Sequence, residues 1–159
     1  MKNINESGRS MVEMLGVLAI IGVLTVGAMS TVNYGIESFR VRAVYDLVEE
    51  TARGVSDLYS WKRSYADESE AATKTKICKN VFDDKCETGT GITDATIKTA
   101  WGNLSVSLDE NGSEFHIQIT GVPYGSCNQL LNMDWVNVSL DANQTCTSNG
   151  ESTLNFTAY

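Results

Sequence analysis

The chain has 159 residues, which is enough for one domain with a hydrophobic core or for one domain and an anchor. Its net charge of −8 and its isoelectric point of about 4.6 argue against binding to nucleic acid through bulk electrostatics. No Lys or Arg follows Lys98, so the C-terminal third is purely acidic and nucleic acid is not an expected partner.

An apolar segment without any charged residue occupies residues 14–36. As a helix, these 23 residues would be about 35 Å long, which is enough to cross a hydrocarbon core of about 30 Å. The chain downstream is polar, so the sequence predicts an anchored soluble domain. Lys2 and Arg9 precede the segment and the next basic residue is Arg40, which favours a cytoplasmic N-terminus.

The residues at the start of this segment carry a family pattern. The run G-R-S-M-V-E-M-L-G-V-L-A-I-I-G-V-L, residues 8–24, resembles the N-terminal signature of type IV pilins and their relatives. In that family a glycine precedes a cleavage site and a glutamate lies five residues into the mature chain, which Gly8 and Glu13 match. The resemblance implies that residues 1–8 are a leader, which a prepilin peptidase removes on the cytoplasmic face. It also implies N-methylation of the new first residue, Arg9, where the family usually has an apolar residue.

Glu13 lies at the edge of the apolar segment, and an ionised side chain at the bilayer centre costs at least about 3 kcal/mol. Cleavage after Gly8 would create an α-amino group a little over one helical turn away. When helices pack with an axial offset, the carboxylate can pair with the amine of a neighbouring subunit and favour one register. The alternative is an interfacial acid that extends to the lipid headgroups. We favour the assembly role.

The helical pattern continues beyond the membrane segment. Apolar residues recur at three- and four-residue spacing, which is typical of an amphipathic helix with one stripe facing a core. The stripe comprises Val41, Val44, Leu47, Val48, Thr51, Ala52, Val55, Leu58 and Trp61. Charged residues mostly occupy the other faces, namely Arg42, Asp46, Glu49, Glu50, Arg53 and Asp57. We expect one helix over about 11–61, with 9–36 as its membrane and assembly part. Residues 37–159 would form the globular head, including the second half of the helix.

Residues 64–100 have a weak pattern and are expected to form a surface loop with a short helix or two. Beyond them, apolar and polar residues alternate in four short runs, which is typical of strands with one buried face. The runs are 106–108, 115–119, 136–140 and 154–158. Asn111 and Gly112 between the first two are a strong hairpin signal. We expect an α+β fold in which the amphipathic half of the helix packs on an antiparallel sheet of about four strands.

The four cysteines are Cys78, Cys86, Cys127 and Cys146. None forms a C-x-x-C pair and the chain has one histidine, His116, so a zinc site is poorly supported. An even number of cysteines beyond a membrane segment suits disulfides in an oxidising compartment. Three pairings are possible, and we favour the nearest-neighbour one, Cys78–Cys86 and Cys127–Cys146.

The C-terminal part carries a further resemblance. The runs AWGNLSVS, FHIQITGVPYGSC and STLNFTAY are similar to the major pilins of the type IVb group, including those of thin conjugative pili. The resemblance implies a pilin-like fold with a C-terminal disulfide that staples the region between the later strands, which fits Cys127–Cys146. Together the two resemblances cover roughly the first 60 and the last 60 residues, and the middle of the chain is unmatched.

Nothing in the sequence argues for an enzyme, a cofactor or a metal site. Nucleophile elbows, zinc-protease pairs and phosphate-binding loops are absent from it. His116 lies on the polar face of a predicted strand, as expected of a solvated histidine rather than a catalytic base. The acidic runs 67–70 and 83–84 lack an EF-hand pattern and are expected to be solvated loop charges.

The expected function is therefore structural. As a major pilin, the chain would be processed by prepilin peptidase and polymerise with itself, through an inner-membrane assembly platform, into a surface filament. The filament would serve adhesion, aggregation or conjugative contact. The precursor would lie in the bacterial inner membrane and the mature chain in the extracellular filament. Two alternatives stay open, a pseudopilin of a type II secretion machine and a minor pilin or tip adhesin of low copy number.

Overall fold

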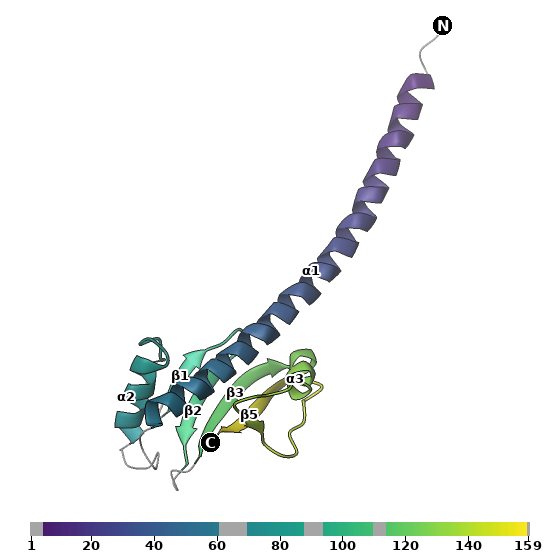
Figure 1. Ribbon diagram of the computed structural model, residues 1–159. Coiled ribbons are helices and arrows are strands. Elements are labelled where there is room, and N and C mark those ends of the chain that lie inside the picture. The colour runs from purple at the N-terminus through teal and green to yellow at the C-terminus, as the bar shows by residue number, and fades with distance from the viewer. Residues whose placement is uncertain (1–4, 61–69, 88–93, 110–113, 159) are drawn as a thin grey trace. The chain divides into compact units, whose positions relative to one another are not determined.

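The computed structural model describes residues 5–60, 70–87, 94–109 and 114–158 (Figure 1). The chain forms two compact units, Met1–Phe39 and Arg40–Tyr159. Helix α1 (Asn5–Tyr59) has 55 residues and contributes to both units. The expectation of one long N-terminal helix is therefore confirmed.

The N-terminal part of α1 is apolar and exposed. Its large apolar side chains, from Met11 to Phe39, have exposed fractions between 46% and 75%. By length and composition the helix could cross a membrane, and none of its most apolar stretch, with a mean hydropathy of 2.2, is buried. The hydroxyls of Thr25 and Thr31 donate to carbonyl oxygens of the same helix, at 2.6 Å and 2.9 Å. These hydroxyls can therefore enter an apolar environment without losing a hydrogen bond.

In the second unit, five antiparallel strands form one sheet in the order β1-β2-β3-β5-β4. The strands are β1 (Ala95–Lys98), β2 (Asn103–Leu108), β3 (Phe115–Pro123), β4 (Ser139–Leu140) and β5 (Glu151–Ala158). Two short helices, α2 (Glu70–Asn80) and α3 (Tyr124–Leu131), complete the unit. This is the α+β architecture expected from the sequence, with five strands rather than about four.

The second half of α1 packs on one face of this sheet (Figure 1). The helix contributes the predicted stripe, in which Val41, Val44, Val48, Ala52 and Val55 are buried. The sheet contributes rows of paired, buried residues: Leu104, Ile119 and Leu154; Val106, Ile117 and Phe156; and Phe115 with Ala158. Alternate residues of the three central strands therefore form the core, as the alternation of apolar and polar residues predicted.

The described residues of the segment 64–100 form more regular structure than the sequence suggested. It contains the expected short helix, α2, but it also contains β1, which pairs with β2 as an edge strand. Helix α3, directly after Pro123, was likewise not expected. The predicted turn at Asn111 and Gly112 and the predicted helix end at Trp61 lie outside the described residues.

The strand expected over 136–140 is reduced to Ser139 and Leu140. The backbone N–H groups of Val136 and Asn137 donate to the Glu49 carboxylate rather than to a neighbouring strand. The prediction of a strand from residue 136 was therefore wrong, because a side chain of α1 takes the backbone donors that a ladder would need.

The backbone at Gly102, just before β2, passes close to the backbone at Thr120 and Gly121. Gly121 has a φ of +79°, which favours glycine, and it lies at the irregularity of β3 between Ile119 and Val122. A Cβ atom added to Gly102 would lie 2.2 Å from the carbonyl oxygen of Thr120. The two backbones approach so closely that a side chain at Gly102 would force them apart.

The structure joins Cys78 to Cys86 and Cys127 to Cys146, which is the nearest-neighbour pairing. The first bond links α2 to the turn that follows it. The second links α3 to the segment before β5 and encloses β4. For a loop of 19 residues, restriction of the unfolded chain contributes about 3 kcal/mol to stability.

Candidate functional site

The residues that sequence analysis connected with processing and assembly lie on one helix. Gly8, Arg9 and Glu13 all belong to the first turns of α1. Glu13 is the fourth residue after Arg9, so their Cα atoms differ by about 6 Å along the helix axis. Glu13 is exposed, as are Met11, Val12 and other apolar residues around it.

This arrangement combines one carboxylate with a long apolar surface. No charged residue lies between Glu13 and Glu37. Burial of the surface against other helices would take the Glu13 carboxylate out of water, which is costly for a charged group. A cationic partner on another chain would offset that cost, and the α-amine that the expected cleavage before Arg9 would create could be such a partner. The chemistry available at this site is ion pairing.

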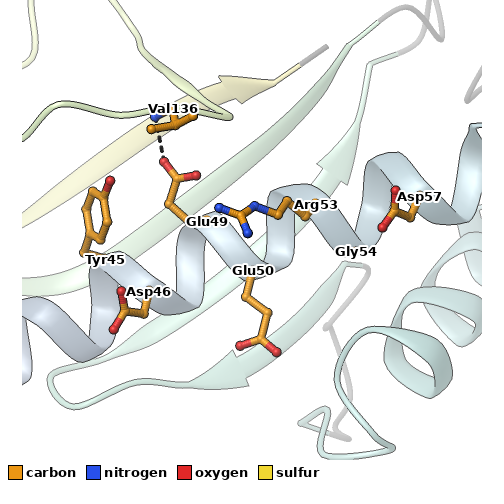
Figure 2. A pocket seen from close by; sticks show the side chains of 8 residues that line it. All are labelled: Tyr45, Asp46, Glu49, Glu50, Arg53, Gly54, Asp57 and Val136. Atoms are coloured by element: carbon orange, nitrogen blue, oxygen red, sulfur yellow. Dashed lines mark hydrogen bonds between the residues drawn. The ribbon is translucent and has the colours of Figure 1, made fainter.

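A second candidate site lies on the head, where α1 meets the segment that follows α3. It is a groove with a volume of about 570 Å³ (Figure 2). Its lining residues are Tyr45, Asp46, Glu49, Glu50, Arg53, Gly54, Asp57 and Val136. Four carboxylates against one guanidinium give the groove a formal charge of −3. Its floor is the side of α1 that carries the exposed residues Asp46, Glu50 and Arg53.

Glu49 is the structural centre of the groove. It is only 5% exposed, in contrast to its charged neighbours on α1. Its carboxylate accepts hydrogen bonds from Val136 N at 2.8 Å, from Asn137 N at 3.2 Å and from the side-chain amide of Asn137. Figure 2 shows the first of these bonds. A buried carboxylate thus obtains three donors, which satisfies the requirement for burying a charge.

Tyr45, which lies one helical turn before Glu49 on α1, contacts the same segment. Its hydroxyl donates to Asp134 O at 2.9 Å, and its ring centroid lies 4.7 Å from that of Trp135. The Trp135 ring also packs edge-on against Phe156, and its N–H donates to Leu130 O at 3.1 Å. We call residues 132–138 the anchored loop.

The anchored loop presents one apolar side chain to solvent. Val136 is 77% exposed although its backbone is fixed by Glu49. The alternating apolar residues at 136–140 predicted a strand, so the exposed position of Val136 in a loop was not expected from the sequence. Glu49 was grouped with the charged residues that mostly occupy the other faces of the helix, but it is buried and its carboxylate turns towards the loop. No pattern in the sequence marks the 87-residue separation between Glu49 and Val136.

His116 belongs to a polar chain across the sheet. Thr157 donates its hydroxyl hydrogen to Asp141 Oδ1 at 2.6 Å, and His116 Nδ1 lies 3.1 Å from Thr157 Oγ1. Because the only hydroxyl hydrogen of Thr157 is used by Asp141, His116 donates its Nδ1–H to Thr157. The histidine is half-buried and hydrogen-bonded on the face of the sheet opposite the core. Among the described residues, His, Cys, Asp and Glu side chains form no group of three that could hold a metal ion.

Replacement of Glu49 tests its role in fixing the anchored loop. We expect Glu49→Ala to lower the free energy of unfolding by about 3 kcal/mol, because it leaves two backbone donors of the loop without an acceptor. Glu49→Gln keeps one acceptor oxygen and should have a smaller effect. Thermal unfolding of the full chain in detergent, followed by near-UV circular dichroism of the Trp135 environment, measures both changes.

Glu50→Ala is the matched control, because Glu50 is the next residue and its side chain is exposed. It should change stability by less than about 0.5 kcal/mol. Equal effects of Glu49→Ala and Glu50→Ala would show that the loop does not depend on the Glu49 carboxylate.

Comparisons with models of protein families, with curated proteins and with solved structures found no match to this chain.

Proposed function

We propose that this chain is a structural subunit of a type IV pilus, a major pilin of the type IVb kind. The observation that carries the proposal is α1, whose apolar part is 46–75% exposed along its length and has Glu13 near its start. A monomer cannot keep such a surface in water, so it requires a membrane or other copies of the helix. The long helix on an antiparallel sheet is compatible with a pilin-like fold.

The same helix indicates which contacts would drive assembly. In the membrane, its apolar side chains contact lipid. In a filament, contacts between helices would replace lipid contacts, so packing and polar pairing rather than the hydrophobic effect would decide the register. Gly16 and Gly22 have open space where a side chain would be, which permits close approach of another helix. Glu13 would pair with the α-amine of a neighbouring copy and select one axial offset.

The head would occupy the outside of the filament. Its core and two disulfides make it a compact unit in its own right. Disulfide bonds persist in oxidising compartments, which fits a head exported from the cytoplasm. Prepilin peptidase, the inner-membrane assembly platform and other copies of the chain are the proposed partners.

The proposal predicts a defined processing event. Mature protein should begin at Arg9, and its intact mass should equal that of residues 9–159, with an added methyl group where the new N-terminus is methylated. Replacement of Gly8 by Leu should leave full-length precursor in the inner membrane, since a bulky residue occupies the cleavage position. Intact-mass spectrometry of the membrane and sheared fractions measures both species.

Gly16→Ala is the control, since it changes a glycine of the same helix eight residues later, where an added Cβ meets no atom within 4 Å. It should be cleaved as the unmodified chain is. A mature chain that starts at another residue would contradict the assignment of Gly8 and, with it, the register assigned to Glu13.

A further inference from the structure

Asn33 is a polar residue in the apolar part of α1 whose side chain has no partner in its own helix. The hydroxyls of Thr25 and Thr31 donate to carbonyl oxygens of α1. The amide of Asn33 has two N–H donors and one carbonyl acceptor, and within the described residues it makes no hydrogen bond. Burial of this part of α1 in apolar surroundings would leave the amide unsatisfied unless another molecule supplied its partners.

In the membrane, water can supply these partners. Asn33 lies three residues before the end of the uncharged segment 14–36, which is about 4.5 Å along the helix axis. Tyr34 follows directly, and tyrosine is enriched where lipid headgroups meet water. The inserted subunit can therefore keep the Asn33 amide hydrated at the headgroup level. In a filament, helices of other copies would replace lipid chains and headgroups alike, so the amide would need a partner from the protein.

Asn33 also lies on a face of α1 that can pack against another helix. This face, which we call the seam, consists of Gly22, Val26, Met29 and Asn33. The four residues are spaced by four, three and four positions, as in one side of a packed helix pair. Val26 and Met29 are 72% and 64% exposed, and a Cβ added to Gly22 would meet no atom within 4 Å. A second helix could therefore approach closely at Gly22 and follow the seam to Asn33.

The seam and Glu13 lie on opposite sides of α1. Asn33 is the twentieth residue after Glu13, and at about 100° per residue this corresponds to a rotation of about 200° around the helix. A single neighbouring helix cannot cover both sides. The seam would therefore contact a different copy of the chain from the one that pairs with Glu13, as expected for a helix surrounded by others.

We propose that the seam packs against α1 of a second copy of the chain and that Asn33 is the positioning residue of this contact. Its amide would hydrogen-bond to a backbone carbonyl or a hydroxyl of the second helix, which lipid chains cannot offer. The inference rests on the proposed filament, in which the seam leaves the headgroups. A single asparagine in an apolar seam selects one register, because in other registers its amide is left unpaired.

Self-association of the full chain in detergent micelles tests the contact without a filament. Sedimentation equilibrium gives the association constant, and we expect Asn33→Ala to lower it by about three- to thirtyfold. Asn33→Gln keeps the amide and should have a smaller effect. Thr25→Ala is the matched control, because the Thr25 hydroxyl already bonds to Ile21 O of its own helix at 2.6 Å. It should change the association constant by less than about twofold.

Equal association of the unmodified chain and Asn33→Ala would overturn the proposal, as would an unmodified chain that stays monomeric at every concentration. Equal weakening by Thr25→Ala would also overturn it, since the effect would then not depend on the amide. Near-UV circular dichroism of each variant should match that of the unmodified chain, because the seam lies outside the head.

Asn33→Cys gives a second measurement, in cells that make filaments. The four native cysteines form two disulfides, so the new thiol is free to react. A small share of this variant is co-expressed with the unmodified chain and treated with a water-soluble maleimide. We expect labelling in the membrane fraction and labelling slower by at least about tenfold in sheared filaments, because assembly takes the seam out of water. Asp57→Cys, at an exposed position on the head, should react in both fractions.

Equal labelling of Asn33→Cys in membranes and filaments would overturn the proposal even though filaments form. Failure of producing cells to make any filament would instead contradict the proposed function. In that case the association constants in detergent would still decide whether Asn33 positions a contact between two copies of α1.

Discussion

Glu13→Gln should abolish filament assembly while leaving the subunit inserted, processed and folded. Glutamine keeps the size and hydrogen-bonding capacity of the side chain but removes the charge that would pair with the α-amine of an adjacent copy. Within an apolar bundle this pair would distinguish one axial offset from others, so its loss should affect register more than insertion. We expect processed protein to accumulate in the inner membrane, with filament yield lowered by at least about tenfold.

Electron microscopy of sheared material and immunoblots of membrane fractions measure this result. Glu37→Gln is the control, because Glu37 is the next acid along α1, beyond the uncharged segment, and its replacement should leave assembly unchanged. Both disulfides of the head should form in either variant. Filaments of normal number and length from the Glu13→Gln strain would show that the carboxylate lies at the membrane interface without a role in assembly. Apolar packing alone would then drive polymerisation.

Gly102→Ala should cause the largest loss of head stability of any methyl-sized substitution discussed for this chain. The added Cβ would lie 2.2 Å from Thr120 O, 2.8 Å from Thr120 C and 3.2 Å from Gly121 Cα. All three atoms are backbone atoms of the neighbouring strand, so no side-chain rotation relieves the contact. The strands must separate where Asn103 N donates to Thr120 Oγ1, and we expect a loss of about 3 kcal/mol.

Gly125→Ala is the matched control for the same chemical change. Gly125 lies in α3, and a Cβ there would meet no atom within 4 Å. Alanine in a helix is favoured over glycine by about 1 kcal/mol, so this variant should be as stable as the unmodified chain or more stable. Thermal unfolding of the full-length variants measures both effects. A Gly102→Ala melting temperature within 2 °C of the Gly125→Ala value, where about 3 kcal/mol predicts a much larger difference, would contradict the close approach of β2 and β3.

Periodicity was sufficient to predict the helix and the central strands. Val41, Val44 and Val48 recur at helical spacing, and Ile117 and Ile119 alternate, because each set faces one shared core. These local patterns specify which face of an element is buried, and the structure confirms them. The pairing of Leu108 with Phe115 likewise follows from two alternating runs separated by a short connection.

The anchored loop could not be predicted in the same way. Val136 and Val138 alternate as strand residues do, yet the Val136 N–H is taken by a carboxylate 87 residues earlier in the chain. Glu49 differs from Glu50 only by a rotation of about 100° around the helix, which no composition or charge pattern reveals. Long-range side-chain to backbone bonds of this kind decide where a strand begins. The groove depends on them, so it too was not predicted.

Strand β1 and helix α3 were not predicted, for a related reason. The four residues of β1 are too few for an alternating pattern to be distinguished from chance, and their strand conformation comes from pairing with β2. Helix α3 has eight residues, and its buried Cys127 and Leu130 show helical spacing only once its start after Pro123 is known. By contrast, the prediction that Gly8 and Glu13 serve processing and assembly depends only on their order and spacing within one short run, and it stays a prediction.

The composition of a surface filament tests the central claim most directly. Filaments are sheared from cells that produce the chain, purified, imaged by electron microscopy and dissolved for intact-mass spectrometry. The account predicts long filaments whose predominant protein is this chain, beginning at Arg9 and containing both disulfides. Producing cells that make no filament containing this chain, or filaments in which it is a trace component, would contradict the claim that it is the major subunit.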